Sequence, residues 1–221
     1  MSALIDSLLL NILPLLVAVV LHEISHGAVA YALGDDTAKK AGRFQLHTHF
    51  DLFGSFLIPL GLHIMNSPFL IGYAKPVPVD ARNFKHPIQD MALVAIAGPL
   101  CNLILAIVSA LCLKNMHIIA DGQNLTFIAN LLLNFLMINL VFFFFNLIPI
   151  PPLDGSRILA VFLPIKILHK FYALEPFGFF IIFGIEIIGG YASNLIGYNF
   201  GIFHNFVKPA VLTMMRLFLS M

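Results

Sequence analysis

Long apolar runs separated by short polar loops dominate the pattern of this chain. Five such runs follow one another, at 8–33, 91–113, 125–148, 173–196 and 200–221. Each is long enough to cross the hydrocarbon core of a bilayer, which takes about 20 helical residues. The first helix is expected from about Asp6 to Asp35, and Pro209 interrupts the last one. The pattern predicts an all-α polytopic membrane protein with about 4–6 transmembrane helices.

Two segments between the first and second runs break the helical pattern. From Gly42 to Asp51 apolar and polar residues alternate, which predicts a short strand. Such a strand offers an edge to which an extended peptide can add; the alternative is a surface hairpin on the lipid headgroups. The segment 52–71 is apolar but contains Pro59 and Pro68. Its uninterrupted part is too short to span, so we expect a re-entrant or interfacial element.

Composition agrees with a membrane protein. Of the 221 residues, 60% are hydrophobic and 10% are charged, far from the values of soluble globular domains. The net charge of +1 provides no basic surface, so nucleic-acid binding is not expected. Cys101 and Cys112 lie in the same apolar run, which argues against a disulfide framework.

The loop charges predict an orientation. If 52–71 does not cross the bilayer, only Lys114 lies on one side. The opposite side then carries nine basic residues: Lys39, Lys40, Arg43, Lys75, Arg82, Lys85, Arg157, Lys166 and Lys170. Because basic loops stay in the cytoplasm, the amino terminus is predicted to be external.

The motif LHEISHG, residues 21–27, places ionisable groups in the middle of the first run. His22 and His26 are four residues apart, so both imidazoles project from one face of a helix. At about 1.5 Å rise per residue, His22 lies roughly 21 Å from Leu8, deep in a layer about 30 Å thick. HExxH is the zincin signature, in which two histidines bind zinc and the glutamate, here Glu23, accepts a proton from the attacking water. The alternative is a set of structural polar contacts between helices.

A catalytic zinc site requires a third protein ligand. The run 125–148 leads into NLIPIPPLDG, residues 146–155, where three prolines within four positions prevent an ordinary helix. Asp154 follows this break directly and is the best candidate among the carboxylates; its alternative role is the N-cap of the next helix. Interhelical hydrogen bonds are expected from four asparagines of the run: Asn130, Asn134, Asn139 and Asn146.

Together these motifs resemble a known family. HEISHG, AGPLCN at 97–102 and NLIPIPPLDG occur in the order typical of the site-2 protease family of intramembrane zinc metalloproteases. GDDTAKKAGR, HFDLFGSFLIP and GYAKPVPVDARNF resemble its compact microbial branch, which lacks a PDZ domain. The resemblance covers most of residues 18–165. It implies one protease domain over 1–221 in the cell membrane of a microbe, with a catalytic core at about 6–165 and C-terminal helices at about 173–221.

The resemblance also implies a role for each site residue. Glu23 would be the general base, and Asn146 would hold the substrate or its developing oxyanion. The GPxxN element at 98–102 would allow close helix packing near the site. One Zn²⁺ per chain would be bound by His22, His26 and Asp154.

The chain departs from the pattern of the compact branch at His47, Thr48 and Leu52, where relatives commonly have Asn-Pro and a proline. These departures fall in or beside the predicted strand. They therefore put in doubt how that strand would hold an extended substrate, and not the metal site. His47 and His49 are expected to be solvated loop residues. Glu186, inside the run 173–196, is expected to be neutral or to form an interhelical hydrogen bond.

The expected activity is hydrolysis of peptide bonds within or near the transmembrane segments of single-span membrane proteins, known as regulated intramembrane proteolysis. The lipid bilayer is the second partner, and no oligomeric state is predicted. The alternative is a zinc-binding transporter or a catalytically silent scaffold on the same fold. A transporter would be expected to show inverted repeats, and a silent homologue to have lost Glu23 or a ligand. Two histidines and a carboxylate also suit iron, although the neighbouring glutamate favours hydrolysis.

Overall fold

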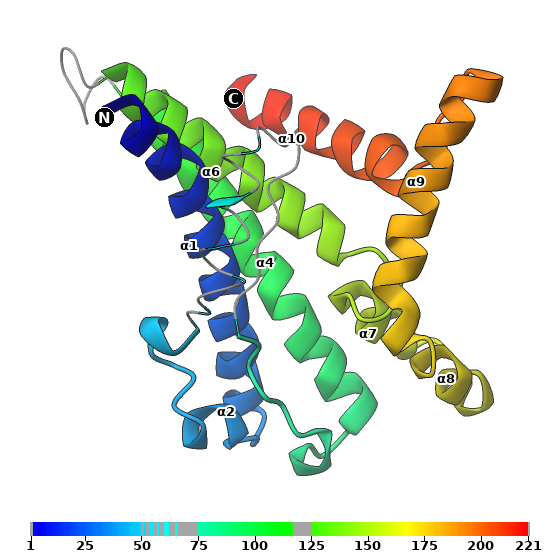
Figure 1. Ribbon diagram of the computed structural model, residues 1–221. Coiled ribbons are helices and arrows are strands. Elements are labelled where there is room, and N and C mark those ends of the chain that lie inside the picture. Colours follow the sequence, from blue (N-terminus) through cyan, green and yellow to red (C-terminus); the bar gives the residue numbers. More distant parts are fainter. Residues whose placement is uncertain are drawn as a thin grey trace.

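Three long helices form the body of the protein. The computed structural model describes residues 2–49, 51, 54, 57, 60, 61, 65, 75–116 and 125–220. The helices α1 (Ser2–Ala32), α4 (Pro87–Lys114) and α6 (Leu125–Asn146) pack against one another side by side (Figure 1). This arrangement brings the HEISH segment of α1 against α4 and α6.

Shorter elements connect and cover the three helices. The polar loop after α1 contains α2 (Thr37–Lys40) and the 3₁₀ helix η1 (Leu46–His49), and η3 (Ala81–Asn83) precedes α4. After α6 the chain forms α7 (Asp154–Ala160), α8 (Ile165–Tyr172), the 3₁₀ helix η5 (Glu175–Phe177) and α9 (Gly178–Ile196). A π-helical turn, η6 (Phe203–Val207), leads into α10 (Lys208–Ser220), which returns towards α6 (Figure 1).

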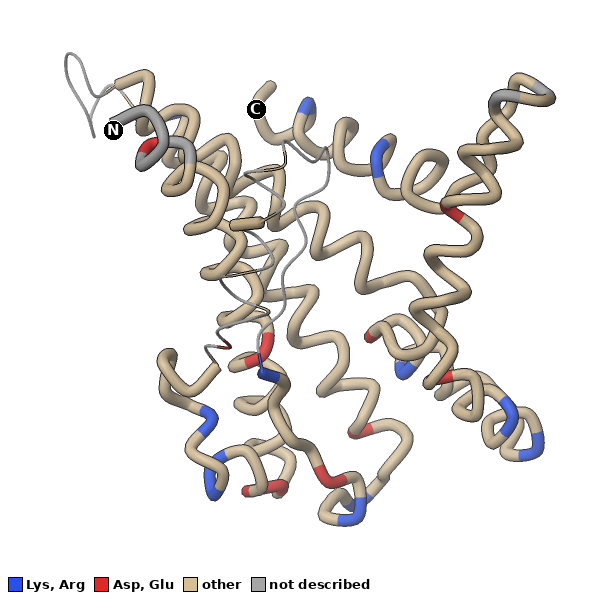
Figure 2. The backbone as a smooth tube through the Cα atoms, in the orientation of Figure 1, with Lys and Arg blue, Asp and Glu red and all other residues tan. Residues whose placement is uncertain are grey.

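The protein is a multi-pass membrane protein. Among the described residues, four helical segments are long and apolar enough to cross a bilayer: Leu8–Ala32, Pro87–Lys114, Leu125–Asn146 and Ile165–Ser193. This number agrees with the predicted range. Lys and Arg residues gather mainly at the end of the bundle where α2 and α8 lie, and α10 carries Lys208 and Arg216 (Figure 2).

The main apolar core lies where α4, α6, α9 and α10 meet. Leu136 and Leu140 of α6 are fully buried there, together with Val207 before α10 and Ile182 of α9. The rest of α9 projects away from the bundle (Figure 1). Large apolar side chains on α9, such as Phe180 and Ile187, are exposed at 77% and 70%, as expected of a helix that contacts lipid.

The predicted strand at 42–51 is wrong over its described part. Gly42 has φ 68°, and the chain then turns into η1 instead of extending. The Thr48 hydroxyl bonds to the carbonyls of Gly42 at 3.1 Å and Gln45 at 2.8 Å, and the Arg43 guanidinium donates to the Thr48 carbonyl. These local bonds satisfy backbone groups that a strand would present to a partner. The described parts of the chain contain no strand.

Most of the predicted re-entrant element at 52–71 lies outside the described residues. The first helix ends at Ala32, three residues earlier than predicted, and Gly34 with φ 105° turns the chain. The helix that contains Pro209 is irregular, as predicted, because the π-helical turn Phe203–Val207 stands just before the proline. Pro209 itself is the second residue of α10.

Candidate metal centre

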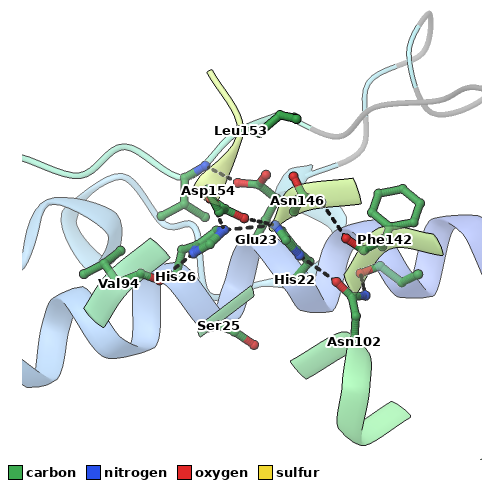
Figure 3. A network of polar contacts seen from close by, with 12 residues as sticks. His22, Glu23, Ser25, His26, Val94, Asn102, Phe142, Asn146, Leu153 and Asp154 are labelled. Carbon is green, nitrogen blue, oxygen red and sulfur yellow. Dashed lines mark hydrogen bonds and ion pairs between the residues drawn. The ribbon is translucent and has the colours of Figure 1, made fainter. Parts of the chain in front are cut away.

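Two histidines of α1 and the first residue of α7 converge between the helices. The Nε2 atoms of His22 and His26 are 3.0 Å apart. His22 Nε2 lies 3.1 Å from Asp154 Oδ2, and His26 Nε2 lies 3.4 Å from Asp154 Oδ1 (Figure 3). These three side chains form a group that could hold a metal ion. The Asp154 carboxylate faces the histidines, so it does not serve as an N-cap: α7 begins at Asp154 itself.

The other nitrogen of His22 is fixed by an asparagine of α4. His22 Nδ1 lies 2.7 Å from Asn102 Oδ1. The orientation of this amide follows from its nitrogen, because Asn102 Nδ2 donates to the Ala18 carbonyl at 3.2 Å and to Asn139 Oδ1 at 2.9 Å. Since the amide oxygen can only accept, the proton of a neutral His22 ring resides on Nδ1. His22 Nε2 then carries a lone pair.

The same argument applies to His26. Its Nδ1 lies 2.7 Å from the carbonyl oxygen of Val94 on α4, which can only accept. A neutral His26 therefore also presents an unprotonated Nε2. Metal-ligating histidines are commonly oriented in this way by a partner on the second ring nitrogen.

The arrangement fits a tetrahedral metal ion. Ligand atoms about 2.0–2.1 Å from zinc lie about 3.3 Å from each other at tetrahedral angles. His22 Nε2 lies 3.0 Å from His26 Nε2 and 3.1 Å from Asp154 Oδ2, close to that value, and His26 Nε2 lies 3.4 Å from the other carboxylate oxygen, Oδ1. Asp154 Oδ2 is the one buried side-chain oxygen or nitrogen of the described residues that has no hydrogen-bond partner. Its contact with His22 is an ion pair only if that ring is protonated. A bound cation, by contrast, would accept a lone pair from each of the three side chains.

The close approach of α4 depends on Gly98. A Cβ atom added at this position would lie 2.5 Å from His22 Cε1 and 2.6 Å from both His22 Nε2 and His26 Cε1. Any side chain here would displace both rings. Similarly, a Cβ at Gly155 would meet the backbone of Leu147 and Ile148, so the residue after Asp154 must also be small.

Glu23 lies next to the first histidine and accepts a hydrogen bond from outside its own helix. Its Oε2 atom is 2.9 Å from the backbone nitrogen of Val77 (Figure 3). Val77 belongs to the segment 75–80, which runs past α1 before η3. The carboxylate is thus tied to a part of the chain 54 residues away.

Asn146 ends α6 near the group, and its side chain is already engaged. Its Nδ2 atom donates to the Phe142 carbonyl of the same helix at 3.1 Å. The predicted interhelical bonds are confirmed for two other asparagines: Asn139 accepts from Asn102, and Asn134 donates to the Leu10 carbonyl of α1 at 2.8 Å.

Three other polar residues lie apart from this centre. His49 is fully buried, contrary to the prediction of a solvated side chain, and both ring nitrogens contact backbone carbonyls. The prediction for His47 is confirmed in that it is exposed. Glu186 accepts a hydrogen bond of 2.5 Å from the backbone of Phe203, so it forms a hydrogen bond with the segment after its own helix.

Sequence reasoning missed the partners that orient the site. The sequence analysis assigned Asn102 only to helix packing. A polar residue inside a membrane-spanning helix usually has a polar partner, so Asn102 could have been predicted to contact one. The Val94 carbonyl and the Val77 amide are backbone groups, so their side chains carry no signal of these contacts.

Comparison with known proteins places the chain in a family. Residues 10–118 match the model of Peptidase family M50. The chain is also 39% identical over 187 residues to the "Putative zinc metalloprotease YwhC" of Bacillus subtilis (strain 168). That match covers 81% of this chain and 82% of the relative. The chain belongs to Peptidase family M50. This confirms the resemblance to site-2 proteases, and the site described above lies on the M50 segment and on α7, which follows it. No solved structure gave a significant match.

Proposed function

We propose that this M50 protein is a zinc metalloendopeptidase that cleaves single-span membrane proteins within or near their transmembrane segments. The observation that carries the proposal is the meeting of three candidate ligand residues, with contacts of 3.0–3.4 Å, beside Glu23, which lies in a candidate membrane span together with both histidines. The name of the Bacillus subtilis relative supports zinc as the metal. Hydrolysis inside a membrane requires a buried polar site of this kind.

His22, His26 and Asp154 would hold the ion. Zinc, when bound, polarises a carbonyl and lowers the pKa of water to about 7. Asn102 and the Val94 carbonyl accept from Nδ1, so in each neutral ring Nε2 carries the lone pair and is aimed at the same point. The burial of His22, which is 5% exposed, limits access of bulk water to the site.

Glu23 would act as the general base. Its position one residue after His22 places a carboxylate beside the ligand group, where it can take a proton from the attacking water and pass it to the leaving amine. Asn146 would donate to the oxyanion through its Nδ2 atom, which has two N–H groups and gives one of them to the Phe142 carbonyl. The substrate helix must unwind locally before cleavage, because helical amides are shielded by their own hydrogen bonds.

The distribution of charge supports an orientation. The end of the bundle where most Lys and Arg residues lie would face the cytoplasm of a microbial cell, which leaves the amino terminus outside (Figure 2). A reporter enzyme fused after Lys40 and, separately, after Lys114 should report opposite sides of the plasma membrane. Equal reporter activity at both positions would refute this topology.

The decisive experiment compares purified wild type with Glu23→Gln and Asp154→Ala on a single-span substrate in liposomes. Glu23→Gln should retain zinc, measured by elemental analysis, and lose cleavage. Asp154→Ala should lose both, because one of three ligands is gone. Glu186→Gln is the matched control, since it neutralises a carboxylate on α9, and should cleave normally.

Cleavage by Glu23→Gln at the wild-type rate would contradict the mechanism. Zinc flux into sealed vesicles that Glu23→Gln leaves unchanged would instead favour a transporter. To find natural substrates, membrane proteomes of cells that express wild type or Glu23→Gln can be compared for fragments that disappear in the mutant.

A further inference from the structure

A short extended segment, 75–80, supplies the backbone N–H that contacts Glu23. Pro76 and Pro78 have no N–H, so within residues 76–78 only Val77 can donate from the backbone. That single donor points at Glu23 Oε2, at 2.9 Å. The two prolines also restrict the backbone to extended conformations, which limits the directions in which the Val77 N–H can point.

The side chain of Val77 packs on the same face of α1, one turn after Glu23. Gly27, the glycine of HEISHG, leaves the space: a Cβ added there would lie 3.0 Å from Val77 Cγ1 and 3.2 Å from Ala38 Cβ. Val77 is therefore held against α1 by its side chain while its N–H binds a carboxylate one turn earlier. An alanine at position 27 would push against Val77 Cγ1 and so shift the Val77 N–H relative to Glu23.

Both ends of the segment are anchored by buried polar groups. At one end, the Lys75 nitrogen donates to the His49 carbonyl at 3.0 Å. The His49 ring lies between two carbonyls, 3.1 Å from that of Lys75 and 2.7 Å from that of Arg43. At the other end, the Asp80 nitrogen donates to Asp35 Oδ2 at 2.8 Å. The segment is thus clamped on either side of Val77, which explains the burial of His49.

We propose that the Val77 N–H is a positioning group for Glu23, and that Gly27 and His49 hold it in place. The inference rests on the proposed function, because it concerns the general base of that reaction. A glutamate has three rotatable side-chain bonds, and a hydrogen bond to a charged oxygen restricts them at little cost. With Oε2 bound to Val77, Oε1 is the oxygen that receives the proton.

The first test removes only this N–H. Replacing the Pro76–Val77 amide by an ester, through an encoded α-hydroxy analogue of valine, keeps the side chain and deletes the donor. The matched control is Val77→Thr, which has nearly the same shape and retains the N–H. Loss of a charge-assisted hydrogen bond predicts a fall in kcat of about 10-fold or more in the ester protein. KM and zinc content should stay at wild-type values.

A second test uses the Gly27 contact. Gly27→Ala should lower kcat without loss of zinc, because it displaces Val77 and not the ligands. The double variant Gly27→Ala/Val77→Ala removes the opposing methyl group and should recover part of the lost kcat. A purely structural role for Val77 predicts no recovery, since the double variant carries two packing changes.

The outcomes separate this inference from the proposed function. If wild type shows no zinc-dependent cleavage that Glu23→Gln abolishes, the proposed function fails. If wild type cleaves and the ester protein has the same kcat, only the positioning role is refuted. An ester protein that loses zinc together with kcat also refutes it, because the N–H would then support the fold of the metal centre.

Discussion

Replacement of Gly98 by alanine is the most direct test of how α4 meets the metal centre. The added Cβ would lie 2.5 Å from His22 Cε1 and 2.6 Å from His26 Cε1. Ordinary van der Waals contact begins at 3.4 Å, so the rings and the new methyl group must separate by 0.9 Å and 0.8 Å, the differences between these values. Because α1 and α4 are packed along their length, part of this shift must come from the rings themselves.

Such a shift is large for a metal site. Ligand distances in zinc sites vary by only about 0.2 Å, and disturbing the groups that orient the ligands lowers metal affinity by about 10-fold to 100-fold. We expect Gly98→Ala to weaken zinc binding by at least the lower of these factors. The stability of the metal-free fold should change less, because overpacking costs about 1–3 kcal/mol while alanine is the better helix former by about 1 kcal/mol.

The assay is competition for zinc between the purified protein and a chelator of known affinity. Thermal unfolding of the metal-free protein shows whether the fold is intact. Gly184→Ala is the matched control, since it makes the same change within a helix and its Cβ would meet nothing within 4 Å. Wild-type zinc affinity in Gly98→Ala, with intact folding, would show that α4 does not press on the two rings, and the geometry of the site would have to be revised.

Two further predictions concern the partners of the site. Asn102→Ala removes the acceptor of His22 Nδ1–H and should weaken zinc binding by about 10-fold to 100-fold in the same competition assay, whereas Ser109→Ala, a buried hydroxyl of α4 bonded to its own helix, should not. Burial alone would raise the pKa of Asp35, but hydrogen bonds from Thr37, the Asp80 amide and Asn83 outweigh it and lower that pKa below its ordinary value. Asp35 therefore stabilises the fold above its ordinary pKa, and this contribution is lost as the pH falls through the lowered value. Thermal unfolding between pH 7 and pH 3 should show a smaller acid-induced loss in Asp35→Asn, and an unchanged loss would contradict the assigned hydrogen bonds.

The long helices and the candidate ligands could be predicted because they depend on local pattern. Apolar runs of sufficient length have few alternatives in a membrane, and His22 and His26 share a face by helical spacing alone. Asp154 was identified from the proline-rich break before it, since backbone that leaves a helix at membrane depth must line a polar site. None of these arguments needs the packing of one helix on another.

The contacts that orient the ligands could not be predicted in the same way. Whether Asn102 reaches His22 depends on the angle and height at which α4 crosses α1, and a single sequence does not determine these. The strand prediction for 42–49 was wrong for a different reason. Alternation of apolar and polar residues indicates a strand only where no local hydrogen bond competes with strand pairing. Here the side chains of Thr48 and Arg43 bond to backbone carbonyls within their own turn, so the segment forms a compact loop instead.

The hydrogen bonds around the ligands give a physical reason to expect a cation between them. A buried polar group without a hydrogen-bond partner costs free energy, and the polar side chains between these helices are hydrogen-bonded. Asn102 uses its oxygen and both directions of its amide nitrogen, and Asn139 accepts from it while donating to its own helix. Within the described residues, the only buried side-chain nitrogen or oxygen without a hydrogen-bond partner is Asp154 Oδ2, which faces His22 Nε2. If both rings are neutral, their Nε2 lone pairs and the Asp154 carboxylate are directed at one another, and a cation held between them would relieve this repulsion.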